Sequence, residues 1–523
     1  MTTTAAVDPA ALPGFRVVDG IRRLPEDTLR NDVAAFLGPA ERGPLGVPVR
    51  VEGRRAYTTV FGGQGTGTVP RAVMAYFANG GEVAWVVRAG RGGGTSHTTV
   101  TFGDDGTGSW APGGPARLSL PGTRLLIAAS GPGVWADRTE VRLTYRAFGV
   151  TGAPDLDVAV TFPSGQVVRA VGLEPAEVPG ALTASSLLVA SWDGPPVQPA
   201  AAAGPASITW TSVLGTGAEP VVDIAALREA IIEQAQIGEI ALVCIPGLAG
   251  LLGQNEQDAV VGDLARSAAG SQDRLAVVSV PSSSTVDGIA ELIAWHRRIA
   301  TAVLDEASRR ALAAYYPPLL AEDLSGTSPD PYVPVDPAGH VCGRTAELDR
   351  TRGSGWSPAN TLVADAVDTA VPVPWPVQEV ALGLGINLIR QRPGGGLELW
   401  GARTRDPGDG RFLAHRRLLH RIVRGVRRVT EPLVFDVNDQ LLRFTVCRAV
   451  NGLLMEAFRS GALQGLTPPE AYRVRCDDTT NPPEVVDAGQ LVCEIEVAPA
   501  APMEFITLRL TLGAEGLLEV VEQ

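Results

Sequence analysis

Apolar residues in the first part of the chain form two unbroken runs and one run with helical spacing. Residues 33–38 read VAAFLG, which predicts a buried strand that ends at Gly38. In residues 69–79 the apolar side chains recur at positions 69, 73, 76 and 77, which is the spacing of a helix face. Gly80 and Gly81 then end that helix, and residues 82–90 read as a second buried strand.

The pattern changes to strict alternation after residue 90. Segments such as ARLSL, EVRLTYRAF and LDVAVTF alternate apolar and polar positions, and Gly-rich turns such as GDDGTGS and SGPG separate them. Short alternating strands with turn signals are typical of a small all-β domain, which we place at residues 95–215. The Ala- and Pro-rich residues 197–207 are interpreted as a linker or loop.

From about residue 216 the pattern becomes one of alternating helices and buried strands. An amphipathic helix follows Asp223, and the strands EIALVCIPG and RLAVVSVP flank a second helix at 258–269. Residues 286–314 are expected to be mostly helical. This alternation predicts a parallel, doubly wound α/β domain at residues 216–355.

The last third contains strands, two long helices and a run of closing strands. Residues 411–428 form an Arg-rich helix, and a second helix is expected at about 438–460. Three strand-like runs follow, and the last of them, MEFITLRLTLGAEGLLEVVEQ, alternates apolar residues to its end. The first 30 residues are instead short apolar pieces among Pro and Gly, which suggests an extended arm.

Composition excludes several chemistries. The chain has 523 residues with 44 basic and 57 acidic side chains, a net charge of −13, and every basic residue is Arg. Without Lys there is no P-loop lysine, no Schiff base and no Ser-Lys dyad. The acidic balance disfavours nucleic-acid binding. No signal peptide and no run of 18 apolar residues is visible, so we expect synthesis and assembly in the cytoplasm.

No set of residues indicates catalysis, a cofactor or a metal. The loop Gly62–Thr68 has the glycine spacing of a phosphate-binding loop but ends in Thr where Lys is required. His340 follows Pro-Ala-Gly in an expected loop and is the one histidine worth testing as catalytic. The cysteines form no CxxC pair, so buried structural thiols are expected; they are Cys244, Cys342, Cys447, Cys476 and Cys493.

The Arg-rich helix carries its charges in a regular pattern. Its apolar side chains fall on one face, and Arg417, Arg421, Arg424 and Arg428 fall on another at spacings of four, three and four. In an acidic chain such a ridge can meet an acidic partner. The alternative is an exposed face whose charges are satisfied by local acids.

Several segments, in order, resemble the tail sheath protein of contractile phage tails and related contractile injection systems. Near the N-terminus they are DVAAFLGPAERGPLGVPV, VFGG and AVMAYFANGGEVAWVVR. In the middle they are AAYYPPLL and PAGHVCGRTAELDRTRGSGWSPAN, and near the C-terminus GINLIRQRPGGGLELWGART, HRRLLHRIVRG, EPLVFDVND and the run from FRSGALQGL to EFITLRL. They cover residues 31–90 and 310–512.

The resemblance implies a mixed α/β and β multidomain fold with a split core. The core would consist of residues 31–94 and 356–512, carrying the β-rich domain at 95–215 and the α/β domain at 216–355 as insertions. Residues 1–30 and 513–523 would be arms that add strands to neighbouring subunits. Candidate arm residues are Phe15, Val17, Val18, Leu517, Leu518, Val520 and Val521.

The implied function is structural. Six-membered rings of this subunit would stack helically around an inner tube protein, between baseplate and cap proteins, and contract to drive the tube through a target membrane. The Arg ridge 417–428 is then the candidate tube-facing surface. Two alternatives remain: a tube or baseplate protein, which the length disfavours, and a secreted or cytoplasmic hydrolase with a Gly-rich β domain and a polar pocket near His340.

Overall fold

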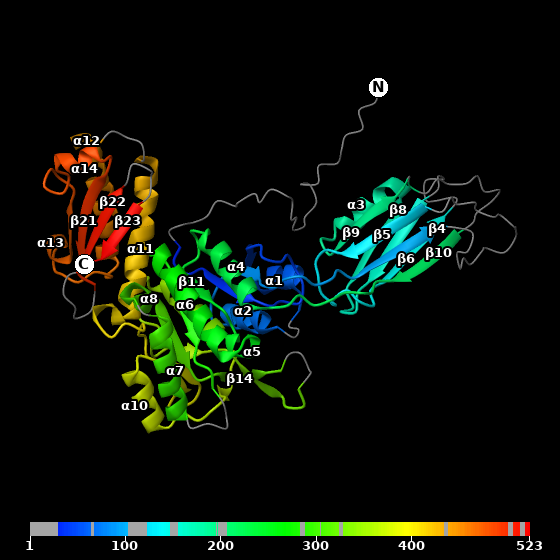
Figure 1. The fold of residues 1–523 in the computed structure, drawn as a ribbon, viewed down its shortest axis with the longest axis horizontal. Helices are drawn as coiled ribbons and strands as arrows, with labels where there is room; N and C mark the ends of the chain where they lie inside the picture. The colour runs from blue at the N-terminus through cyan, green and yellow to red at the C-terminus, as the bar shows by residue number, and fades with distance from the viewer. Residues whose placement is uncertain are drawn as a thin grey trace.

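The computed structural model consists of an α/β body, a β-sandwich and a C-terminal unit (Figure 1). It is described for residues 30–63, 67–102, 123–146, 155–194, 196, 207–282, 288–303, 305–323, 328–433, 438–499, 506–512 and 518–522. The fold is therefore mixed α/β and multidomain, as predicted.

A nine-stranded sheet forms the centre of the body. Its order is β16-β19-β18-β13-β12-β11-β1-β3-β2, with parallel pairing from β18 through β3 and antiparallel strands at both edges. The strand bounds are β1 Ala34–Gly38, β2 Val49–Glu52, β3 Val83–Arg88, β11 Leu242–Cys244, β12 Leu275–Ser279, β13 Leu312–Tyr316, β16 Leu362–Val363, β18 Asn387–Gln391 and β19 Leu397–Trp400.

Helices cover both faces of this sheet because its central strands are apolar on both sides. In β1, Ala34 and Phe36 enter one core, whereas Ala35 and Leu37 enter the other. The first core is closed by α1 Gly53–Phe61, α2 Thr68–Ala78 and α9 Ala338–Thr351. The second is closed by α4 Ile224–Ala235, α6 Gln254–Ser271, α7 Gly288–Ala302 and α10 Trp375–Gly383.

Two glycines let α9 lie directly on α2. An added Cβ at Gly339 would come within 2.2 Å of the Ala72 carbonyl oxygen, and one at Gly343 within 2.5 Å of the Tyr76 carbonyl oxygen. Only residues without a side chain permit this approach, so the PAGHVCG segment is a helix-packing surface. The remaining elements of the body are α5 Leu248–Leu251, α8 Glu306–Arg310, η3 Asp409–Arg411 and the small sheet of β14 Leu319–Glu322, β15 Tyr332–Val335 and β17 Asp368–Thr369.

The structure differs from the predicted domain division in two respects. Residues 216–355 are not a separate inserted domain, because β11, β12 and β13 lie in the sheet between β1 and β18. The described residues from Leu418 onward, which the prediction assigned mainly to the core, instead belong to a unit with its own apolar cluster and sheet. Strand pairing between distant segments decides both points, and the pattern of apolar residues does not encode that pairing.

The β-rich segment forms two antiparallel sheets around a common apolar cluster. One sheet contains β10 Ser207–Val213, β6 Glu140–Arg146, β7 Asp155–Thr161 and β8 Val167–Leu173; the other contains β4 His97–Phe102, β5 Thr123–Ala129 and β9 Leu188–Asp193. A turn with η2 Pro175–Glu177 and α3 Val178–Thr183 precedes β9. Buried Arg88 joins this sandwich to the body, since its guanidinium donates to the carbonyl oxygens of Ala40 (2.9 Å) and Pro132 (3.0 Å).

The C-terminal unit packs two long helices against a four-stranded sheet. Its helices are α11 Leu413–Thr430, α12 Gln440–Arg459, α13 Pro468–Ala471 and α14 Pro483–Asp487, with η4 Glu431–Leu433 between the first two. The antiparallel sheet has the order β20 Tyr472–Arg475, β21 Leu491–Val497, β22 Ile506–Leu512 and β23 Leu518–Glu522. No helix among the described residues is long and apolar enough to cross a bilayer.

Candidate functional site

Helix α11 connects the C-terminal unit to the body (Figure 1). Its Leu418, Leu419, Ile422, Val423 and Val426 side chains are buried in the apolar cluster of the C-terminal unit. At its start, Leu413 belongs to a core of the α/β body instead. One helix therefore contributes to the packing of both units.

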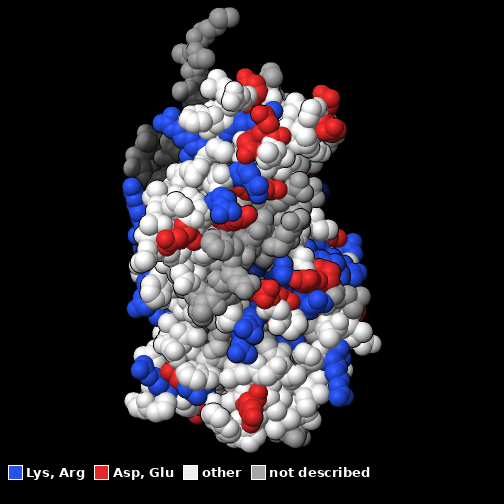
Figure 2. All heavy atoms as spheres, turned by 90° about the vertical axis from the view of Figure 1, so that its left-hand side faces the viewer, with Lys and Arg blue, Asp and Glu red and all other residues white. Residues whose placement is uncertain are grey.

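The predicted tube-facing ridge is wrong for two of its four arginines. Arg417 is fully buried and Arg424 is 2% exposed, whereas Arg421 is partly exposed and Arg428 is exposed. Arg421 lies 3.9 Å from Glu456 of α12. Acidic and basic side chains are interspersed on the face of the molecule that carries the C-terminal unit (Figure 2). The four arginines do not form a continuous exposed surface.

Arg424 binds backbone carbonyls at the amino edge of the large sheet. Its guanidinium donates to the oxygens of Asp273 (3.0 Å), Arg30 (2.8 Å) and Glu239 (3.0 Å), and also to that of Ile240. These carbonyls come just before β12, β1 and β11. Burial lowers the pKa of Arg424 to about 10, so the side chain remains charged at neutral pH.

Arg417 makes a similar contact at the same edge of the large sheet, with the backbone just before β1. It donates to the carbonyl oxygen of Asn31 and pairs with the Asp349 carboxylate of α9, while the Asn31 amide donates to the Arg417 carbonyl oxygen at 3.1 Å. Burial, and secondarily the positive charge of Arg424, lower the pKa of Arg417 to about 9. Together the two arginines attach α11 to three strand starts, and we name this contact the arginine clamp.

A second feature of this unit is its outer strand. β22 pairs with β21 on one side and with β23 on the other, in a register that sets Leu510 against Val520. Among the described strands, β23 has β22 as its one neighbour, so its other edge pairs with no described strand. Leu518, Val520 and Val521 lie in β23; Leu517, Phe15, Val17 and Val18 lie outside the described residues.

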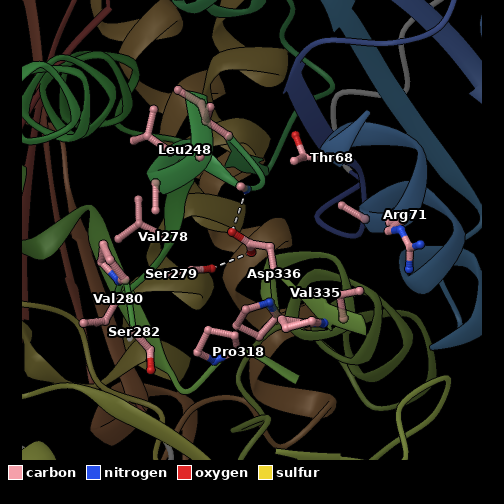
Figure 3. Close-up of a pocket in the computed structure, with 18 of the residues that line it drawn as sticks. Thr68, Arg71, Leu248, Val278, Ser279, Val280, Ser282, Pro318, Val335 and Asp336 are labelled. Atoms are coloured by element: carbon pink, nitrogen blue, oxygen red, sulfur yellow. Dashed lines mark hydrogen bonds between the residues drawn. The ribbon is translucent and has the colours of Figure 1, made fainter. Parts of the chain in front are cut away.

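A cavity of about 570 Å³ lies at the carboxyl ends of β11 and β12, next to the start of α2 (Figure 3). The Asp336 carboxylate accepts hydrogen bonds from the Gly247 amide (2.8 Å), the Ser279 hydroxyl (2.5 Å) and the Ala338 amide (2.8 Å). Figure 3 shows Ser279 and Asp336 pointing toward each other in this cavity. Asp336 is thus used to hold the surrounding loops.

The glycine-rich loop and the possible metal ligands considered from the sequence show no sign of a reactive site within the described part of the chain. In the Gly62–Thr68 loop, residues 64–66 lie outside the described residues, and α2 begins at Thr68. Arg71, in the first turn of α2, pairs with Asp323 at 2.7 Å. Among the residues that the structure describes, no group of three His, Cys, Asp or Glu side chains could hold a metal ion.

His340 lies in helix α9 rather than in the expected loop. It is 1% exposed, its Nε2 lies 3.3 Å from the Asp365 carbonyl oxygen, and burial lowers its pKa. The expectation failed because Gly339 and Gly343 reduce helix propensity, which packing against α2 overrides. A buried imidazole in a helix interface is a structural group, and His340 is not among the residues that line the cavity at Asp336.

The known proteins to which this chain is similar in sequence are tail sheath proteins of phages. No family model matches the chain. The tail sheath protein of Burkholderia phage BcepMu is 23% identical over 519 residues, which cover 94% of this chain and 95% of the phage protein. The tail sheath proteins of Vibrio phage KVP40 and Enterobacteria phage T4 are 27% and 24% identical over 182 and 196 residues, or 34% and 35% of this chain. For those two relatives, the match spans only 26% and 28% of their own length.

Solved structures share the fold over nearly the whole chain. The sheath tail protein of Listeria innocua has a TM-score of 0.64 at 12% identity, covering 93% of this chain and 96% of its own. The helical sheath of the anti-feeding prophage in its contracted state has a TM-score of 0.53 at 19% identity, with coverage of 95% and 98%. The chain thus has the fold of solved sheath proteins, and its predicted resemblance to tail sheath proteins is confirmed.

Proposed function

We propose that this chain is a contractile sheath subunit. One observation carries the proposal: a tail sheath protein aligns with 94% of the chain, and solved sheath proteins share its fold over 93–95% of it. The subunit polymerises as helically stacked six-membered rings around an inner tube protein and shortens to drive the tube through a target membrane. It performs no bond chemistry, and it is made and assembled in the cytoplasm as part of a phage tail or a tail-like particle.

The outer edge of β23 supports polymerisation through strand addition. An exposed strand edge offers a row of backbone donors and acceptors, and a strand from another subunit satisfies them without any particular side-chain sequence. Such main-chain bonds can hold two subunits together while their bodies rotate. We propose that both arms take part in this exchange: residues 513–523 provide the edge, through β23, and residues 1–30 of another subunit provide the added strand.

The partners of the proposed assembly follow from the same likeness. A chain in the six-fold symmetrised baseplate of the anti-feeding prophage has this fold, with a TM-score of 0.54 and 95% coverage of this chain. The six-fold symmetry of that baseplate supports six-membered rings that begin at a baseplate. The inner tube and a terminal cap are the other expected partners.

Electron microscopy of the purified full chain in negative stain tests the proposal. A sheath subunit expressed alone should form long hollow cylinders with six-fold end views. Coexpression with its tube protein should give filled cylinders. Monodisperse monomers at every salt concentration would contradict the proposal, because the assembly contacts would then be absent.

A further inference from the structure

Three of the five cysteines meet inside the C-terminal unit. Cys476 directly follows β20, and extending the β20–β21 register, in which Arg475 pairs with Glu494, sets Cys476 opposite Cys493. Cys447 of α12 packs against the apolar cluster that contains both of them. Residues separated by up to 46 positions in the sequence, from 447 to 493, thus bring their thiols to one place.

The three thiols differ in access and in acidity. Cys447 is partly exposed, whereas Cys476 is 7% and Cys493 is 1% exposed. Hydrogen bonds from the Cys476 and Cys493 thiols, and from the Cys476 backbone, lower the pKa of Cys447. The thiolate is the form of cysteine that oxidants attack, so the accessible member of the cluster is also the reactive one.

We propose that Cys447 and Cys476 are an oxidation site at which hydrogen peroxide forms a disulfide between α12 and the end of β20. In the first step the Cys447 thiolate attacks one peroxide oxygen; the O–O bond breaks, and with one proton taken up, water leaves and a sulfenic acid remains. In the second step the Cys476 sulfur attacks the sulfenic sulfur, the S–S bond forms, and the hydroxyl leaves with the Cys476 proton as a second water. Two thiols are oxidised and one peroxide is reduced.

Cys476 rather than Cys493 is the resolving thiol because of where each one lies. Helix α12, which carries Cys447, packs on β20, and Cys447 contacts the same apolar cluster that contains Cys476. Cys476 lies past the last paired residue of β20, so a small backbone adjustment can bring it into disulfide geometry. Cys493 is fixed within β21, which is paired on both sides.

The chain supplies its own control in a second pair of thiols. Cys244 and Cys342 are both fully buried in a core of the α/β body, and burial raises the pKa of Cys244. Hydrogen bonding and Coulomb interaction with Cys342 act in the same direction. Two thiols that lie together in a core, out of reach of solvent, are expected to resist the same oxidant.

Peptide mapping of the full chain after peroxide treatment, under non-reducing conditions, tests the site. We expect a cross-linked pair of peptides that contain Cys447 and Cys476, which dithiothreitol separates, and unchanged Cys244 and Cys342. In Cys476→Ser, Cys447 should accumulate as a sulfenic acid that dimedone traps. Cys493→Ser should still form the cross-link.

Three results would overturn the assignment. The first is that Cys447 stays reduced at a peroxide concentration that oxidises a free thiol in solution. The second is a cross-link from Cys447 to Cys493 in the wild-type chain. The third is that Cys244 and Cys342 are oxidised to the same extent as Cys447 and Cys476. Mapping requires no particle assembly, so these outcomes do not depend on the proposed sheath function.

Discussion

The arginine clamp makes a strong and specific prediction for the substitution Arg424→Met. Methionine fills much of the same volume but donates no hydrogen bond, so three buried carbonyl oxygens (Asp273, Glu239 and Ile240) and the partly buried one of Arg30 lose their donor. Each unsatisfied buried carbonyl costs about 1–3 kcal/mol. The loss is partly offset because the variant no longer buries a charge whose cost is evident in the lowered pKa of Arg424.

The net destabilisation should be about 3–5 kcal/mol, the range expected when one member of a buried polar network is removed. At about 2–4 °C per kcal/mol for a unit of this size, the thermal transition of the body should fall by about 6–20 °C. Arg421→Met is the matched control on the same helix. Its side chain is 41% exposed and its partner Glu456 is 74% exposed, so the change should cost less than about 1 kcal/mol.

Differential scanning calorimetry of the two variants and the wild type measures these shifts. Hydrogen exchange at the starts of β1, β11 and β12 localises them, because these amides lie next to the carbonyls that lose their donor. Equal transition temperatures for Arg424→Met and Arg421→Met would refute the reasoning, since the buried contacts would then contribute no more than an exposed ion pair. An effect confined to the β-sandwich would refute it as well.

Three further predictions concern acid stability, helix packing and assembly. Burial lowers the folded-state pKa of His340, His415 and His420, so the unfolded chain takes up protons first as the pH falls. The free energy of unfolding in urea should therefore decrease below about pH 6.5, by up to about 1.4 kcal/mol per pH unit for each of these histidines. A flat profile between about pH 7.5 and about pH 5.5 would contradict this. Gly339→Ala should lower the free energy of unfolding in chemical denaturation by about 1–3 kcal/mol, because the added Cβ meets the Ala72 carbonyl oxygen. Gly383→Ala is the control: its added Cβ has open space around it, so this change should be neutral or slightly stabilising. Equal effects of the two substitutions would count against close α2–α9 packing. Deleting residues 513–523, which include β23, should prevent the formation of cylinders in negative stain while leaving the thermal transition of the body unchanged, and cylinders of normal length would argue against the arm.

Much of the secondary structure was predictable from the sequence because apolar periodicity reflects burial. The run at 33–38 predicted β1, and the helical spacing at 69–79 predicted α2, which spans Thr68–Ala78. The end of the expected helix at 286–314 was wrong, since Leu312–Tyr316 is strand β13. A short apolar run reads equally well as a helix end or a buried strand, and only its place between β12 and β18 decides.

The arginine clamp was not predictable for a different reason. Regular arginines opposite an apolar stripe are the usual pattern of an exposed helix face. The acceptors for Arg424 are backbone oxygens that lie 151 to 394 positions away in the sequence. Carbonyl oxygens have no residue signature, so no pattern of acidic side chains could reveal that this face is buried. The seven-residue interval between Arg417 and Arg424 does place both on one side of the helix, and that much follows from helix geometry.

The clamp also restricts where movement can occur in the proposed sheath. The apolar side of α11 packs in the C-terminal unit, and its Arg417 and Arg424 side chains bind the amino edge of the body. Turning the C-terminal sheet relative to the body would strip both buried guanidinium groups of their acceptors at once, at a cost of several kcal/mol. If the chain assembles as proposed, changes of shape between lattices would concentrate between subunits, where bonds at a strand edge can persist while whole bodies rotate. The buried arginines would then keep the outer edge of β23 at a constant orientation on each body, so that in the proposed assembly a neighbour bound at that edge would move with the body as it turns.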